Sequence, residues 1–156
     1  MTTQVSTLTE LDGTDREILK HLQRNARKSF KKIGEEAGVS EATVFVRVKK
    51  LKEKGVLKGF RAILDPATIG KTLTAIVLVR ANPQTFPGML DALKRIDDIY
   101  EIYDVTGEYY SILKIRTSGT DELSKIMDRI GTIDGITGTE SIIVLRTVKE
   151  ELGVSI

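Results

Sequence analysis

Basic and hydroxyl side chains recur at helical spacing between residues 41 and 54. At the helical repeat of about 3.6 residues per turn, Thr43, Arg47, Lys50 and Lys54 share one face, with Val46 at its border. Arginine and lysine can donate to guanine edges or to phosphates, and threonine or valine can contact a thymine methyl group. This combination of side chains predicts a helix face that reads the major groove of DNA.

A second face of the same stretch is apolar. Val44, Val48 and Leu51 form a narrow stripe with Phe45 at its edge, and such a stripe predicts a core contact with neighbouring helices. The seven cations between residues 47 and 61 admit a second interpretation, because a charged helix face often serves only to keep a helical bundle in solution. The coincidence of the basic face with a separate apolar stripe favours DNA binding.

The residues around this stretch predict a helix-turn-helix. Ser40 is a good N-cap for a helix over 41–54, and Gly38 ends a preceding helix that Ser29 begins. Two helices joined by a short turn containing glycine are typical of this motif. Residues at the start of the second helix usually reach the bases, so Ser40 and Glu41 are further candidates for base contact.

The helix that Ser29 begins carries candidate phosphate contacts. Ser29, Lys31 and Lys32 lie at its N-terminus, where unpaired N–H groups and the helix dipole favour an anion. A capping box that starts at Thr14 predicts one more helix upstream, over 15–24. Helical period is therefore expected throughout residues 14–54.

Charge separates the chain into two parts. Residues 1–64 hold 14 basic and 8 acidic side chains, and residues 65–156 hold 10 and 14. We predict a helix-turn-helix domain over 1–64, with a frayed tail at 1–10 and a linker strand at 56–64, and a second domain over 65–156. No apolar run is long enough to span a membrane, the tail lacks the pattern of a signal peptide, and the absence of cysteine excludes disulfides. A cytoplasmic protein is expected.

The second part alternates between strand and helix periods. The predicted strands span 72–80, 99–105, 109–116 and 138–148; one helix opens within 82–88, and another is capped by Thr120 and closed by Gly131. The order βαββαβ predicts an α+β fold of the ferredoxin-like type, with two helices on one face of an antiparallel sheet. The other face has alternate residues too apolar to face water, so we expect a second subunit to cover it; they include Ile76, Leu78, Ile142 and Val144.

A longer set of residues extends over the helix-turn-helix and beyond it. It comprises Leu11-Asp12, Asp15, Ile18-Leu19, Leu22, Asn25-Ala26, Ser40, Thr43-Val44, Arg47-Val48, Leu51, Gly55-Val56-Leu57, Gly59-Phe60 and Leu64-Asp65-Pro66. This combination resembles the DNA-binding part of the Lrp/AsnC regulators. The resemblance continues through the βαββαβ segment, which it identifies as a RAM-type domain, and it is more specific than a helix-turn-helix alone.

The resemblance implies double-stranded DNA and further copies of the chain as partners, as dimers that assemble into tetramers or octamers. It also implies a small effector, such as an amino acid, at the turn between the second and third strands. Here that turn is Thr106, Gly107, Glu108, Tyr109 and Tyr110. The glycine permits close backbone approach to a ligand, and the carboxylate suits an α-amino group.

The start of the last strand belongs to the same implied site. Thr139, Glu140 and Ser141 match a hydroxyl-bearing stretch of the family, whose hydroxyl and N–H groups could hold an α-carboxylate. Many members carry an acidic residue where this chain has Tyr110, so a larger or aromatic-contacting effector, or none, stays open. An ordinary hairpin turn, with Tyr109 and Tyr110 packed at an interface, stays open as well.

The patterns together predict a homo-oligomeric regulator that binds a roughly palindromic site with two recognition helices about one DNA turn apart. The alternative is an architectural protein that coats DNA without an effector. RNA binding by the sheet is disfavoured, because the second part is net acidic and lacks paired aromatic residues on central strands. Catalysis is disfavoured because His21, the single histidine, has no partner for a triad nearby, and no cofactor or metal motif occurs.

Overall fold

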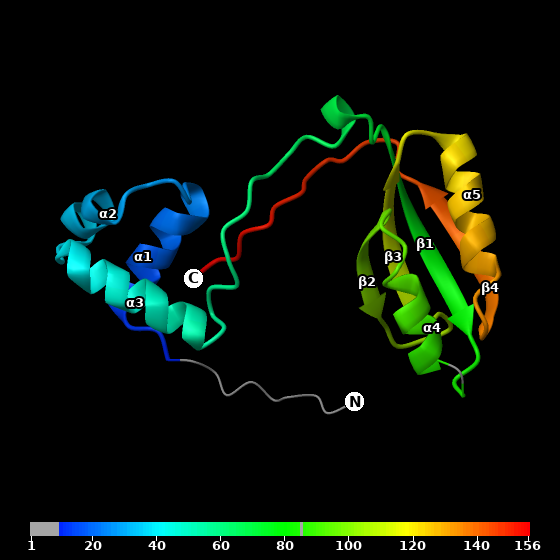
Figure 1. Cartoon of the computed structure of the whole chain (residues 1–156), viewed down its shortest axis with the longest axis horizontal. Coiled ribbons are helices and arrows are strands. Elements are labelled where there is room, and N and C mark those ends of the chain that lie inside the picture. The colour runs from blue at the N-terminus through cyan, green and yellow to red at the C-terminus, as the bar shows by residue number, and fades with distance from the viewer. Residues whose placement is uncertain (1–9, 85) are drawn as a thin grey trace. The chain divides into compact units, whose positions relative to one another are not determined.

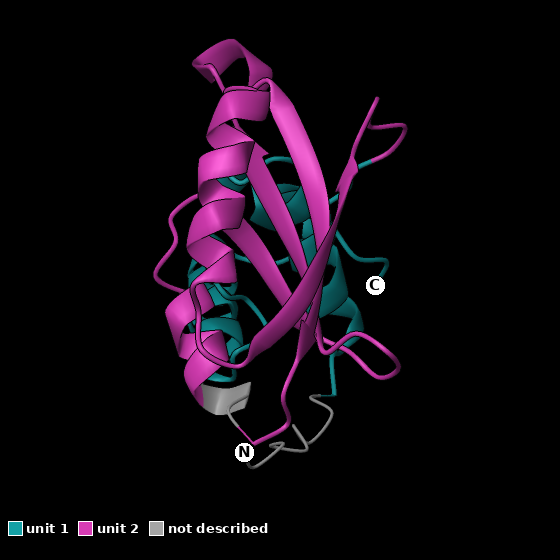
Figure 2. Ribbon diagram, turned by 90° about the vertical axis from the view of Figure 1, so that its right-hand side faces the viewer, with its two compact units in different colours: residues 1–63, 150–156 teal, residues 64–149 magenta. Residues whose placement is uncertain are grey.

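The computed structural model describes residues 10–84 and 86–156 (Figure 1). The first helices are α1 (Gly13–Arg24), α2 (Phe30–Ala37) and α3 (Glu41–Glu53). After a short 3-10 helix, η1 (Ala67–Ile69), follow β1 (Leu73–Ala81), α4 (Phe86–Leu93), β2 (Ile99–Asp104), β3 (Ser111–Thr117), α5 (Thr120–Gly131) and β4 (Ile136–Ile143). The chain divides into two compact units, residues 1–63 with 150–156 and residues 64–149 (Figure 2). Every helix in the described part of the chain is too short or too polar to cross a membrane.

The first unit is built on three helices around a small apolar core. Ile18 and Leu22 of α1, Ile33 of α2, and Val44 and Val48 of α3 are buried against one another. The buried residues named on α1 and on α3 lie four positions apart, so they fall on one side of each helix, as expected of amphipathic helices. Their packing holds α3 with its polar side outward.

Two helices begin at residues other than those the sequence predicts. The Asp12 carboxylate accepts a hydrogen bond from the backbone N–H of Asp15 at 2.7 Å, so Asp12 is the cap and Thr14 lies inside the first turn of α1. The predicted cap of α5 is also wrong, because Thr120 is already helical and Gly119 precedes it without a side-chain cap. In both cases a hydroxyl residue lies close to the true helix start.

The second unit contains one four-stranded antiparallel sheet in the order β2-β3-β1-β4. Val77 of β1 lies opposite Leu113 of β3 on one side and opposite Ser141 of β4 on the other. Helices α4 and α5 cover one face of the sheet (Figure 2), where Leu93 and Ile126 are buried in its core. The predicted α+β fold and βαββαβ order are confirmed.

Within the described residues of the second unit, neither helix lies on the other face of the sheet. Along β1 the residues beneath the helices are fully buried, whereas Ile76 and Leu78, which point the opposite way, are only half-buried. Ile142 of β4 lies opposite Ile76 and is 47% exposed. Tyr103 of β2, opposite Ile112 of β3, is 53% exposed. We call this surface the open face of the sheet.

Two predicted strands differ from the structure. β4 ends at Ile143 rather than at residue 148, because its neighbour β1 starts at Leu73 and offers no further partner; the last hydrogen bond joins the N–H of Val144 to the carbonyl of Thr74 at 2.9 Å. The linker strand over 56–64 is absent from the single chain, where residues 58–65 have no regular secondary structure. A strand requires a hydrogen-bonded neighbour, and residues 58–65 have none in the single chain.

The last residues of the chain lie with the first unit. Gln23 of α1 donates a hydrogen bond from its side-chain amide to the carbonyl of Val154 at 3.0 Å and accepts one from the N–H of Val154 at 2.8 Å. One amide side chain thus pairs with both backbone groups of a residue, as a neighbouring strand would. Residues 150–156 were predicted to belong to the second domain, since nothing local to them indicates a contact 131 residues away.

Candidate nucleic-acid interface and effector turn

Local hydrogen bonds determine how α3 begins. The Ser40 hydroxyl accepts a hydrogen bond from the N–H of Thr43 at 3.1 Å and shares another with the Thr43 hydroxyl at 2.8 Å. Gly38 ends α2 in the left-handed region at φ 69°, a conformation that glycine adopts without strain. The predicted caps Ser29, Gly38 and Ser40 are confirmed. The turn that they define directs the first residues of α3 outward.

The two faces of α3 separate as their spacing predicts. Val44, Val48 and Leu51 are buried, so they belong to the core and are not available to DNA. Phe45 is 58% exposed and Val46 47% exposed. The centroid of the Phe45 ring lies 6.4 Å from that of the Phe30 ring on α2. The apolar stripe therefore fixes the rotation of α3 about its own axis.

The exposed face of α3 borders a hollow between α3 and the residues that precede α1. Thr43, Val46, Lys50 and Lys54 line this hollow from α3. Glu41 lies exposed at the start of the helix, and both lysines are exposed. The structure thus gathers the predicted hydroxyl, methyl and ammonium groups on one accessible surface, which is the chemistry of major-groove contact.

Arg47 lies on the same face but is engaged within the chain. Its Nη1 donates to Asp12 Oδ2 at 2.6 Å and to Asp15 Oδ1 at 2.8 Å, and its side chain is 30% exposed. The hydrogen bonds to Asp12 and Asp15 raise the pKa of Arg47 above its usual range. The backbone N–H of Asp15, followed by the Arg47 side chain, lowers the pKa of Asp12. In the free chain Arg47 therefore ties α3 to the start of α1.

The start of α2 places its predicted phosphate contacts together. The Ser29 hydroxyl accepts a hydrogen bond from the N–H of Lys32 at 3.2 Å, which caps the helix. Lys31 and Lys32 are exposed in its first turn. The unpaired N–H groups of a first helical turn point outward from the helix end. The lysine ammonium groups and these backbone donors are therefore available together at the start of α2.

The predicted effector turn surrounds an arginine that the sequence analysis did not single out. Arg80 of β1 donates from Nε to Glu108 Oε1 at 2.9 Å and from Nη2 to the Tyr109 hydroxyl at 2.9 Å. The Tyr109 hydroxyl in turn donates to Glu140 Oε2 at 2.6 Å. Arg80 also lies over the Tyr109 ring, 4.5 Å from its centroid. Its hydrogen bond to Glu108 raises the pKa of Arg80, and that to Glu140 raises the pKa of Tyr109.

Strand geometry separates the other candidate effector residues. Thr139 and Ser141 lie opposite Val79 and Val77 in the ladder, on the helix-covered side, and the Ser141 hydroxyl contacts the sulfur of Met127 at 3.5 Å. Glu140 lies opposite Leu78 and faces the open side. The three residues of this stretch therefore do not converge on one point in the single chain.

Within the turn itself, the residues also differ in role. Gly107 has a φ of 118°, which explains the need for glycine there, and Thr106 is exposed beside it. Tyr110 packs against the core beneath the helices, and its N–H donates to the carbonyl of Val79 at 2.8 Å. Tyr110 therefore anchors the turn, while Glu108 and Tyr109 face Arg80.

Comparison with known proteins assigns both units to one family. The AsnC-type helix-turn-helix domain matches residues 11–52, and the Lrp/AsnC ligand-binding domain matches residues 74–154. The chain belongs to the Lrp/AsnC family, and it is a DNA-binding transcription regulator rather than an enzyme.

Individual relatives extend over most of the chain. The HTH-type transcriptional regulator FL11 of Pyrococcus horikoshii is 38% identical over 140 residues, covering 90% of this chain and 93% of the relative. The regulatory protein AsnC of Escherichia coli K12 is 33% identical over 146 residues, covering 89% and 96%. The solved structure of E. coli AsnC matches with a TM-score of 0.87 at 31% identity, over 92% and 97% of the two chains. A Neisseria meningitidis regulator in complex with L-Met shares the fold, with a TM-score of 0.88 at 22% identity over 94% and 97%.

Proposed function

We propose that the chain is a sequence-specific regulator that reads the major groove with the exposed face of α3. The observation that carries this proposal is the separation of two faces on α3: Val44 and Val48 are buried, while Thr43, Lys50 and Lys54 line an accessible surface. Because the buried residues fix the rotation of α3, its exposed side chains can present a defined set of donors and methyl groups to base edges. Ser29, Lys31 and Lys32 then contact the phosphate backbone and set the register of the helix.

Arg47 contributes to DNA binding only if it first releases its carboxylate partners. Its guanidinium is held by two carboxylates in the free chain, and it reaches DNA only by exchanging them for a base or a phosphate. Base readout therefore falls first to Ser40, Glu41, Thr43 and Lys50. Arg47 acts mainly as the residue that fixes α3 against α1.

Selection of binding sites from a pool of random duplexes tests sequence specificity. We expect the selected duplex to bind at least about 1,000-fold more tightly than the random pool. Lys50→Ala should reduce that ratio, whereas Lys49→Ala, on the same helix but outside the hollow, should leave it unchanged. A ratio near one would instead assign the chain to the architectural class that coats DNA without preference.

The open face of the sheet is proposed as the subunit interface. Ile76, Leu78 and Ile142 form an apolar surface there, and a second copy of the same face can cover it by two-fold symmetry. Dimers place two recognition helices on successive major grooves of a palindromic site. Dimers of the same chain can then assemble further into tetramers or octamers.

We place a small amino-acid-like effector at the turn over 106–110. Support comes from the match of the ligand-binding domain to residues 74–154 and from the charged cluster of Arg80, Glu108 and Glu140 around Tyr109. An ammonium and a carboxylate on one ligand fit such a mixed-charge cluster. A neighbour in fold has been solved with L-Met, which agrees with a ligand of this size.

A thermal-shift screen over amino acids and related metabolites tests this second part. A ligand at about 100 times its dissociation constant adds roughly 2.7 kcal/mol to the stability of the unit that binds it, which gives a clear rise in melting temperature. DNA affinity measured with and without that ligand shows whether binding is coupled to regulation. The absence of any shift across the screen would remove the effector from the proposal.

A further inference from the structure

A basic cleft lies where the end of α1 meets the start of α2. Arg24, Arg27, Lys28 and Lys32 line it against a single carboxylate, that of Glu36. With these side chains charged, the lining carries three net positive charges while the neighbouring imidazole is neutral. Arg24, Arg27 and Lys32 are exposed, so their charges are accessible from solvent. A polyanion is the ligand class that such a lining attracts.

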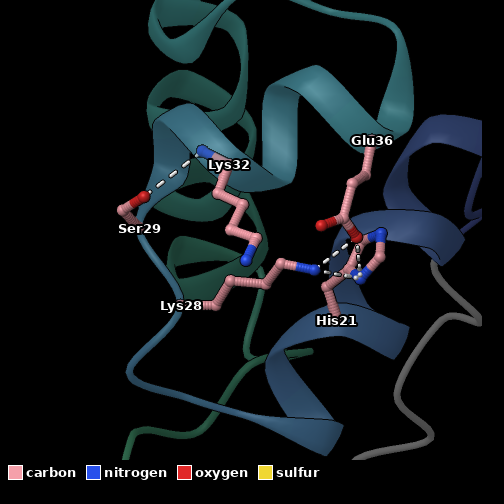
Figure 3. Close-up of polar contacts among 5 residues, drawn as sticks. All are labelled: His21, Lys28, Ser29, Lys32 and Glu36. Atoms are coloured by element: carbon pink, nitrogen blue, oxygen red, sulfur yellow. Dashed lines mark hydrogen bonds and ion pairs between the residues drawn. The ribbon is translucent and has the colours of Figure 1, made fainter.

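His21, Lys28 and Glu36 form a triad in one wall of this cleft (Figure 3). The Lys28 ammonium bonds to Glu36 Oε2 and lies 3.2 Å from Nδ1 of His21. The same Nδ1 lies 3.5 Å from Glu36 Oε2. The His21 and Lys28 side chains are only 14% and 16% exposed, so this contact is largely shielded from solvent. Figure 3 also shows Lys32 descending from α2 toward Lys28.

The 3.2 Å contact between Lys28 Nζ and His21 Nδ1 is a hydrogen bond only while His21 is neutral. An ammonium group has donors only, so a bond between Lys28 and Nδ1 needs an unprotonated nitrogen as acceptor. Protonation of His21 removes that acceptor and places a second cation beside Lys28. The new imidazolium can then donate to Glu36 directly, and the long, flexible lysine is the partner that leaves.

Charged groups from each neighbouring segment surround His21. Glu17 and Arg24 lie on its own helix, Lys28 comes from the connecting loop, and Lys32 and Glu36 come from α2. The hydrogen bond from Lys28 lowers the pKa of Glu36, so this carboxylate stays ionised. Imidazole is the side chain that ordinarily changes charge between pH 5 and 8, and His21 is the single histidine of the chain.

We propose that this cleft binds one backbone phosphate of DNA and that protonation of His21 strengthens the contact by releasing Lys28 from Glu36. The inference rests on the DNA-reading role proposed for α3, because both elements belong to the same three-helix unit. Protonation raises the charge of the lining by one and frees an ammonium group beside Arg24, Arg27 and Lys32. The chain with a protonated His21 therefore binds DNA more tightly than the chain with a neutral one.

Fluorescence anisotropy with the full chain and a random-sequence duplex tests the proposal at about pH 5.5 and about pH 8, over a series of chloride concentrations. Wild type should bind more tightly at the lower pH, by about threefold for each added phosphate contact, and His21→Gln should lose this increment. Glu36→Gln frees Lys28 at every pH, so it should bind tightly at both. The double variant Arg24→Ala/Arg27→Ala should lower the salt slope by about 1 to 2 per chain.

Arg16→Ala is the matched control, because Arg16 is an exposed arginine on α1 outside the cleft; its pH response should equal that of wild type. Thermal melts at both pH values confirm that each variant is folded. An unchanged pH response in both His21→Gln and Glu36→Gln, or an unchanged salt slope in the double variant, would overturn the proposal. The proposal would also be overturned if the double variant lost binding of inorganic phosphate but kept its affinity for DNA. The cleft would then be a site for free phosphate.

The test separates this inference from the proposed function of α3. If wild type binds DNA and Lys50→Ala reduces discrimination while the cleft variants change nothing, only the phosphate cleft fails. If Lys50→Ala leaves discrimination unchanged but the cleft variants lose affinity, the cleft stands and the reading role of α3 fails.

Discussion

Gly34 lies on α2 at the point where the helix packs against the turn that leads into α3. A Cβ atom built on Gly34 would lie 2.6 Å from the carbonyl oxygen of Val39 and 3.3 Å from the backbone nitrogen of Glu41. The N–H of Val39 already donates to the carbonyl of Gly34 at 2.9 Å. All these neighbours are backbone atoms, so Gly34→Ala cannot be absorbed by rotating a side chain.

Two opposing terms decide the stability of Gly34→Ala. Alanine in a helix interior is favoured over glycine by about 0.8–1 kcal/mol. Against this, ordinary contact begins near 3.4 Å, so the turn must move by roughly 0.5–0.8 Å, and overpacking of this kind costs about 1–3 kcal/mol. We expect a net loss of about 1 kcal/mol, which lowers the melting temperature of a unit of this size by about 4–8 °C.

The displacement also affects function, because the atoms that must move belong to the start of α3. Denaturant unfolding of the full chain and anisotropy with a selected duplex should both report the change. Gly88→Ala is the matched control: its Cβ meets no heavy atom within 4 Å, so α4 should gain a few tenths of a kcal/mol. If Gly34→Ala is as stable as wild type and binds DNA equally well, the close approach of α2 to the turn does not constrain the motif.

Three further predictions concern the ion pairs and the open face of the sheet. The pKa of Asp12 is lowered in the folded chain. Its carboxylate therefore stabilises the first unit above the ordinary carboxyl pKa of about 3.9, and this stabilisation is lost as the pH falls through the pKa of the folded state. In denaturant titrations the stability difference between wild type and Asp12→Asn should narrow below about pH 4. Ile142→Asp places a charge in the proposed subunit interface, and sedimentation should show a dimer dissociation constant raised at least about 30-fold; an unchanged constant would place the interface elsewhere. Glu108→Ala should abolish the thermal shift and DNA response of any effector while leaving effector-free DNA affinity unchanged, and a retained response would exclude this turn.

Local signals in the sequence determined most of the first unit. Ser29 and Ser40 begin helices because a side chain accepts a bond from an N–H three residues later, and Gly38 ends one because it tolerates positive φ. The burial of Val44 and Val48 follows from helical period alone. The same reasoning with a period of two predicted the sheet and its apolar open face, and it could also have shown that Glu140 faces away from Thr139.

Contacts between distant residues were decided only by the tertiary structure. Arg47 has the type and position of a base reader, and its capture by Asp12 and Asp15, 35 and 32 residues earlier, becomes visible only when α1 and α3 pack together. Arg80 meets Glu108 because β1 lies in the middle of the sheet. Helical period and capping act over one to four residues along the chain, whereas an ion pair depends on which elements approach in space. The sequence by itself therefore determined which face of α3 is turned outward, and the fold decided which of its cations are free to meet DNA.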